Sequence, residues 1–209
     1  DQVRPLTQEE RDGFAALGFD EEKLKADLGV DALPGEPGYT ALERLWARPT
    51  LEINGIFGGF QGEGTKTVIP ARAGAKITCR LVPDQDPEQV LDAIEAHLRA
   101  HCPPGVKLEI GRMSGTPAAI TPIDHPAIRA AMKALTEAYG TEARFIRTGG
   151  SIPVVGTFSR VLGTPCVLMG FGLEEENFHA PNEHFHLENF DLGMRALYRF
   201  WHHLADIMR

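Results

Sequence analysis

The sequence lacks the features that mark several large classes of protein. It has no excess of basic residues: 21 Lys and Arg stand against 29 Asp and Glu, for a formal net charge of −8. A surface that neutralises nucleic-acid phosphates or an anionic membrane is therefore not expected. No apolar run approaches the roughly 18 residues that span a bilayer, and residues 1–5 resemble no signal peptide. We predict a globular, cytoplasmic protein.

Cysteine is scarce and shows no motif. Cys79, Cys102 and Cys166 are widely spaced, lie in or beside apolar segments, and form no Cys-x-x-Cys pair of the zinc or redox kind. We predict buried free thiols. The chain also opens on Asp1 rather than Met, which we interpret as a sign that it was cut or built from something longer.

The first part of the chain is expected to combine short helices with strands. Residues 1–48 fit short capped helices, with capping patterns at Thr7 and Glu10, at Asp20, and at Thr40 and Glu43. Apolar and strand-like segments follow at 51–57, 75–83 and 106–110, and a helix opens at 86–88. Alternation at 75–83 predicts a half-buried strand. Strand, helix and strand together predict a small α+β domain.

After residue 115 the pattern changes to alternating helices and strands. Helices are expected at 124–139, with Gly140 as the stop, and at 154–162, and strands are expected at 143–147 and 166–169. The closing helix at 188–208 carries an apolar stripe that we interpret as core: Phe190, Met194, Leu197, Trp201 and Leu204. This order predicts an α/β sheet.

The segment around His179 is the first candidate site. It follows an expected strand, and ligands of open α/β sheets bind in loops beyond the carboxyl ends of strands. No Lys or Arg occurs between Arg160 and Arg195, whereas six carboxylates do, so the loop is expected to attract a cation. His179 is then either a metal ligand or a solvated residue of an acidic loop.

Two further segments have polar residues that can bind anions. The turn at 147–153 contains Gly150 and Ser151 before an expected helix, where backbone amides and a hydroxyl can hold a carboxylate. An ordinary strand-to-helix connection is the alternative. Lys66, Thr67 and Arg80 lie on the polar side of the small domain, and Arg80 is either a bidentate carboxylate ligand or a solvated side chain.

Four motifs in order resemble one family. These are Gly64 to Pro70, Arg80 to Pro83, Arg147 to Pro153 and His179 to Glu183. Together they are similar to the dinuclear-zinc metallopeptidases that include carnosinase, cytosolic non-specific dipeptidase, carboxypeptidase G and aminoacylase, and most of all to the carnosinase-like branch. The resemblance covers nearly the whole chain.

The resemblance implies both a fold and an activity. It implies a ferredoxin-like α+β lid that supports dimerisation at residues 1–115, with its first strand missing, and the C-terminal part of an α/β zinc-peptidase catalytic domain at 116–209. The implied reaction is hydrolysis of dipeptides or small peptides with two divalent metal ions: zinc, or alternatively manganese or cobalt. Removal of acyl groups from N-acyl amino acids, or a non-catalytic dimerisation and binding module, are the alternatives.

The same resemblance implies roles for individual residues. His179 matches the final metal ligand of the family, and Gly150 with Ser151 matches a loop that holds substrate. Thr67 and Arg80 match lid residues that reach the substrate, with Arg80 on its C-terminal carboxylate. No residue of this chain is implied as a catalytic acid or base.

The chain also departs from the family. The resemblance finds no counterpart here of the family's His-x-Asp motif, bridging Asp and Glu-Glu pair, which supply the other ligands and the base. No His-x-Asp occurs in the chain, and Glu9-Glu10 and Glu21-Glu22 lie in expected helical segments of the lid rather than after sheet strands. Met113 stands where relatives have a His before Pro117. Since catalytic zinc sites use about three protein ligands, we expect this chain alone to be inactive and to retain no metal tightly. Its expected partners are the missing half of the catalytic domain and a second copy.

Overall fold

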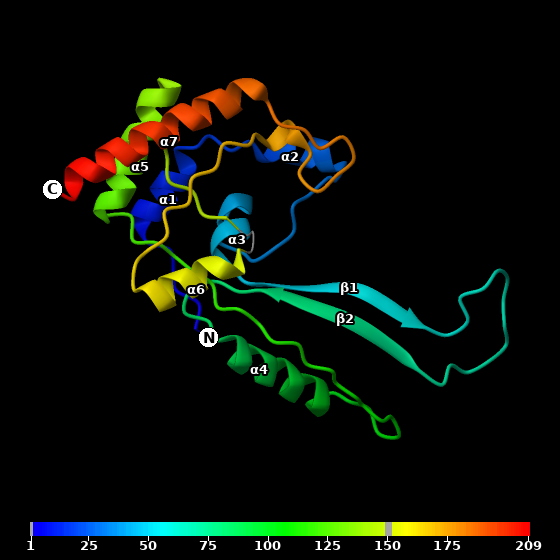
Figure 1. Cartoon of the computed structure of the whole chain (residues 1–209). Helices are drawn as coiled ribbons and strands as arrows, with labels where there is room; N and C mark the ends of the chain where they lie inside the picture. The colour runs from blue at the N-terminus through cyan, green and yellow to red at the C-terminus, as the bar shows by residue number, and fades with distance from the viewer. Residues whose placement is uncertain (1, 149–151) are drawn as a thin grey trace. The chain divides into compact units, whose positions relative to one another are not determined.

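The computed structural model describes residues 2–148 and 152–209 (Figure 1). Its elements in chain order are α1 (Gln8–Ala15), α2 (Glu21–Leu28), α3 (Ala41–Ala47), β1 (Thr50–Gly58), β2 (Ala73–Arg80), α4 (Pro87–Ala100), α5 (Pro126–Tyr139), α6 (Pro153–Leu162), the 3₁₀ turn η1 (Glu174–Glu176) and α7 (Leu187–Ile207). One compact unit is built around residues 18–119, and the other around 120–146 and 154–209. The predicted mixture of helix and strand is confirmed.

The short helices of the first unit begin at the predicted capping residues. Asp20 accepts hydrogen bonds from the amides of Glu22 and Lys23, which fixes the start of α2. Thr40 and Glu43 form a capping box at the start of α3, and the buried Glu43 also pairs with Arg11 at 2.7 Å. Thr7 and Glu10 make the corresponding pair of contacts ahead of α1.

Strands β1 and β2 form a long antiparallel hairpin. Pairing runs from Thr50 with Arg80 at one end to Gly58 with Ala73 at the other, with a register shift between Ile53 and Gly55. The predicted half-buried strand is wrong, because side chains on both faces of the hairpin stay largely exposed. A two-stranded ribbon has only two faces, and nothing in the described part of this unit covers either along its length.

Three predicted strands are absent from the described residues. The segments 106–110, 143–147 and 166–169 form no strand and pair with no neighbouring strand there. Alternating apolar residues define a strand only when another strand supplies hydrogen-bond partners. The periodicity was therefore wrong about sheet formation within the described residues.

The second unit is centred on α5 packed against α7. Ala130, Ala131 and Ala134 form the contact face of α5, and Phe200 of α7 packs against them. Small alanine side chains let the two helices approach closely. Gly140 ends α5 in a left-handed conformation with φ of 69°, as the sequence predicted. Helices α5, α6 and α7 lie within two residues of their predicted bounds.

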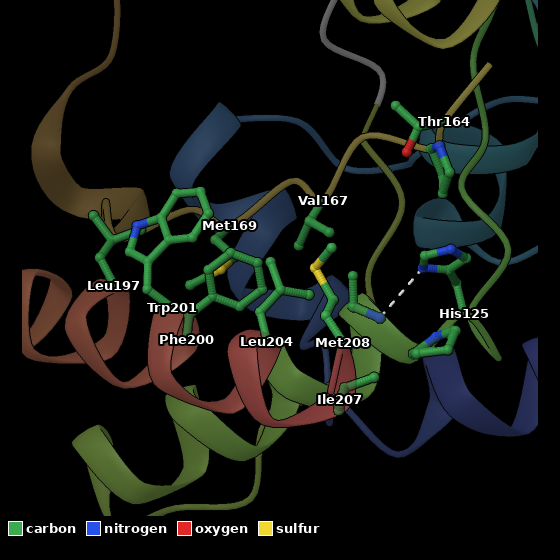
Figure 2. A pocket seen from close by; sticks show the side chains of 13 residues that line it. His125, Thr164, Val167, Met169, Leu197, Phe200, Trp201, Leu204, Ile207 and Met208 are labelled. Atoms are coloured by element: carbon green, nitrogen blue, oxygen red, sulfur yellow. Dashed lines mark hydrogen bonds between the residues drawn. The ribbon is translucent and has the colours of Figure 1, made fainter. Parts of the chain in front are cut away.

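The predicted core stripe of α7 is largely exposed. Phe190, Met194 and Trp201 are 57, 57 and 63% exposed, whereas the buried residues of the helix are Gly193, Ala196 and Phe200. The stripe borders an apolar cavity of about 710 Å³ whose lining includes Val167, Met169, Leu197 and Trp201 (Figure 2). Interpreting the whole stripe as core was wrong for this chain, because α5 covers only the adjacent face.

The described residues also bear on the predictions about cysteines and membrane-spanning segments. All three cysteines are free and only half-buried, so the free thiols are confirmed and their full burial is not. None of the helices in the described ranges combines the length and the apolar content that crossing a membrane requires.

Candidate functional site

The loop that carries His179 joins η1 to the start of α7. Three of its non-glycine residues have positive φ: Asn177 at 55°, His179 at 60° and Asn182 at 62°. Two tight turns hold this shape, since the amide of Ala180 donates to Asn177 at 2.9 Å and the amide of Glu183 donates to Ala180 at 3.3 Å. The imidazole of His179 is exposed at this loop. It is therefore accessible to a ligand.

The residue directly before the loop, Glu176, has a fully buried carboxylate. Glu176 is 0% exposed, and its side chain accepts hydrogen bonds from the amide of Leu173 at 2.9 Å and from the amide and ring Nδ1 of His186 at 2.8 Å each. Burial by itself raises the pKa of Glu176, but the hydrogen bonds from His186 and Leu173 outweigh it and lower that pKa. Glu176 is therefore held as a carboxylate.

Glu176 is the buried residue of this segment that the sequence did not single out. It was counted only as one of six carboxylates expected to attract a cation, whereas its oxygens face inward to backbone amides. The ring Nδ1 atoms of both neighbouring histidines are also engaged, His184 with the carbonyl of Asn182 at 3.1 Å and His186 with Glu176. The only signal in the sequence was the spacing of Glu176, which precedes His179 by three positions and His186 by ten.

The chain's described residues do not assemble a metal centre. Among them, no three His, Cys, Asp or Glu side chains come together in a group that could hold an ion. An exposed imidazole fits one ligand position of a zinc-type site, which needs three or four protein ligands. His179 can therefore serve as one ligand, and the described residues do not supply the others.

The two expected lid residues lie at opposite ends of the hairpin. Arg80 pairs with Thr50 at one end, while Thr67 lies in the connecting loop 59–72, which continues past the other end (Figure 1). From Ala73 to Arg80 the strand rises by roughly 23 Å, at about 3.3 Å per residue. Since a dipeptide is shorter than this, the structure does not bring Thr67 and Arg80 of one copy to one substrate.

The remaining expected residues are only partly described. Gly150 and Ser151 lie outside the described residues. Arg147, just before them, forms an ion pair with Glu10 and is mostly buried, with 18% of its side chain exposed. In the hairpin loop, Lys66 lies over the ring of Phe60 at 5.7 Å. Arg147 is thus held within the first unit by its ion pair with Glu10.

Comparison with known proteins covers the whole chain. Residues 11–106 match the peptidase dimerisation domain of the M20 family. The chain is 33% identical to the Cys-Gly metallodipeptidase of Schizosaccharomyces pombe over 99% of its length and 44% of that protein. It is 30% identical to human Beta-Ala-His dipeptidase over 99% of its length and 41% of that protein.

A solved structure gives the same assignment. The M20 family metallo-carboxypeptidase Sso-CP2 from Sulfolobus solfataricus is similar with a TM-score of 0.83 and 32% identity, over 95% of this chain and 45% of that one. The chain thus spans less than half the length of the relatives it matches. Both the sequence likeness and the fold likeness extend from the hairpin to α7. The chain belongs to the M20 peptidase family.

Proposed function

We propose that this chain is part of a dinuclear metal-dependent hydrolase that cleaves the amide bond of dipeptides or small peptides, and that His179 supplies one metal ligand. The observation that carries the proposal is the exposed His179 on a loop held by a buried carboxylate. The 33% identity to a Cys-Gly metallodipeptidase over nearly the whole chain supports it. Zinc is the proposed metal, with manganese and cobalt as alternatives, and the proposed location is the cytoplasm.

The proposed roles follow from the chemistry of each side chain. The metal ions, when bound, polarise the scissile carbonyl and acidify a water molecule. His179 offers a neutral imidazole to one ion, and Arg80 offers two parallel N–H donors to the substrate's C-terminal carboxylate. Thr67 and Ser151 offer hydroxyl donors, and the backbone of Gly150 offers an amide, for the other polar ends of the substrate. These groups bind and orient, and the proton-transferring base is not among them.

We propose that the rest of a catalytic domain covers the exposed face of α7. In this assignment residues 1–115 are the lid, and 116–209 are the C-terminal part of the catalytic domain. The exposed stripe at Phe190, Met194 and Trp201 and the apolar cavity beside it support this, because monomeric proteins rarely leave so much contiguous apolar surface in water. The chain alone is then inactive, since the remaining ligands and the base come from elsewhere.

We further propose a homodimer formed through the lid. The match of residues 11–106 to a peptidase dimerisation domain supports it. The separation of Thr67 from Arg80 along the hairpin adds an independent reason. Strand β2 alone rises by roughly 23 Å from Ala73 to Arg80, and Thr67 lies in the loop beyond Ala73, so the two residues can both contact small substrates only by serving two different active sites. In this arrangement Arg80 serves one substrate and Thr67 the substrate of the other copy.

The test uses the protein at its natural length with zinc, cobalt or manganese. Hydrolysis of Cys-Gly and of β-Ala-His is expected, and His179→Ala is expected to abolish turnover and lower the metal content. The control is His184→Ala, a nearby imidazole with its Nδ1 on a backbone carbonyl, which is expected to retain both. Normal turnover in His179→Ala would refute the assignment. Faster cleavage of N-acyl amino acids than of dipeptides would favour a deacylase instead.

A further inference from the structure

We propose that Glu176 is a positioning residue that holds the His179 loop in shape by tying its two ends together. The proposal depends on the proposed function in one respect only, the role of His179 as a metal ligand. All of the residues involved belong to one unit, within residues 173–186.

The contacts of Glu176 span the loop. Its Oε2 accepts the amide of Leu173, before the loop, at 2.9 Å. Its Oε1 accepts the amide and the ring Nδ1 of His186, after the loop, at 2.8 Å each. Its backbone carbonyl also accepts the amide of His184 at 3.1 Å. One oxygen thus holds the entrance of the loop and the other holds its exit.

These contacts of Glu176 with Leu173 and His186, here called the clamp, need a carboxylate rather than any polar side chain. Three N–H donors meet two oxygens, and a carboxylate only accepts, so every contact is favourable. In Glu176→Gln one of these oxygens becomes an NH₂ group that faces another donor. The negative charge also lies where α7 begins, and the partial positive charge of a helix N-terminus favours an anion there. Full burial keeps water from replacing the lost contacts.

The loop benefits from such a clamp because three of its residues have an uncommon backbone conformation. Asn177, His179 and Asn182 all have positive φ, which Asn and His adopt more readily than most residues with a Cβ but still less readily than negative φ. If the two ends separate, His179 is expected to relax to negative φ, which turns its imidazole away from its present place. A displacement of the imidazole by about 1 Å is enough to weaken metal binding or slow a reaction, because both depend on exact positions of the participating groups.

The experiment compares Glu176→Gln with Glu175→Gln in the protein at its natural length. Both substitutions remove one negative charge from neighbouring positions, but Glu175 is exposed. In Glu176→Gln, amide hydrogen exchange of Leu173, His184 and His186 is expected to accelerate by about 10- to 100-fold, as loss of a charge-assisted hydrogen bond implies. Exchange in α5 is expected to stay unchanged, which a general loss of stability would not permit.

Metal binding supplies the second readout. Equilibrium dialysis with Zn²⁺ is expected to show about 10- to 100-fold weaker binding in Glu176→Gln than in Glu175→Gln, the usual size of an effect from outside the ligand set. If Glu176→Gln fails to fold, His186→Ala replaces it, because this ring is 44% exposed and its loss removes a single donor. Faster exchange at residues 173–186 is again expected.

The outcomes separate the two proposals. Exchange in Glu176→Gln or His186→Ala that equals exchange in Glu175→Gln overturns the clamp, whatever happens to the metal. Faster exchange with unchanged zinc affinity overturns the positioning role. Unchanged zinc affinity in His179→Ala refutes the proposed function instead, because that variant leaves the contacts of Glu176 in place.

Discussion

Substitution of Trp201 tests whether another part of the protein covers α7. Trp201 is 63% exposed, whereas its neighbour Phe200 is 8% exposed and packs on α5. If the rest of a catalytic domain covers Trp201, it buries about 150 Å² more of apolar surface, which contributes about 4 kcal/mol at ~25 cal/mol per Å². In the protein at its natural length, Trp201→Ala is then expected to lower the free energy of unfolding about as much as Phe200→Ala, by ~3–5 kcal/mol.

Urea unfolding followed by circular dichroism measures this difference. Phe200→Ala serves as the buried reference, and Arg195→Ala serves as the solvent-facing control, because its ion pair with Asp191 is exposed on both sides. An exposed pair contributes under about 1 kcal/mol. If Trp201→Ala resembles Arg195→Ala while Phe200→Ala loses ~3 kcal/mol or more, then α7 keeps its exposed face and the proposed covering domain is wrong.

Two smaller predictions concern backbone and charge. Gly140→Ala is expected to lower the free energy of unfolding by about 1–2 kcal/mol in thermal unfolding, because φ is 69° there. Gly13→Ala lies inside α1 and is equally uncrowded, so it is expected to raise the free energy of unfolding by about 0.5–1 kcal/mol. Equal effects of the two substitutions would contradict the conformational reasoning. The hydrogen bond from Arg4 lowers the pKa of Asp84, so its contribution to stability is present above the ordinary value of 3.8 and lost as pH falls through the lowered pKa. The stability deficit of Asp84→Asn is therefore expected at pH 6 and should vanish in strong acid, and a deficit that persists there would show that charge is not its cause.

Local signals in the sequence were sufficient for the helices. Caps at Asp20 and Thr40 and the stop at Gly140 act through hydrogen bonds and backbone preferences within a few residues, so they are readable without the fold. The strands at 106–110 and 166–169 were not readable in the same way, because sheet formation depends on partners distant in sequence. The exposure of Trp201 could likewise not be predicted, since an apolar stripe on a helix does not determine which other surface covers it.

The candidate site was predictable only where a single residue carries the signal. His179 was proposed from its loop and its motif; the structure shows it exposed at that loop, and its role as a metal ligand stays a prediction. Glu176 was not singled out, because the sequence does not distinguish a buried glutamate from a solvated one. Which of several acidic residues turns inward depends on the path of the backbone between η1 and α7. The separation of Thr67 and Arg80 required the register of the hairpin in the same way.

The hairpin also constrains how this protein can vary. Because β1 and β2 are paired from Thr50 with Arg80 to Gly58 with Ala73, a residue added to one strand alone shifts the register, as the one already present between Ile53 and Gly55 does. Adding one residue to both strands moves the connecting loop outward by about 3.3 Å and turns every later side chain to the opposite face. Adding two to both restores the faces and lengthens the hairpin by about 7 Å. The facing of its side chains, Arg80 included, is therefore expected to survive changes of length in paired steps of two.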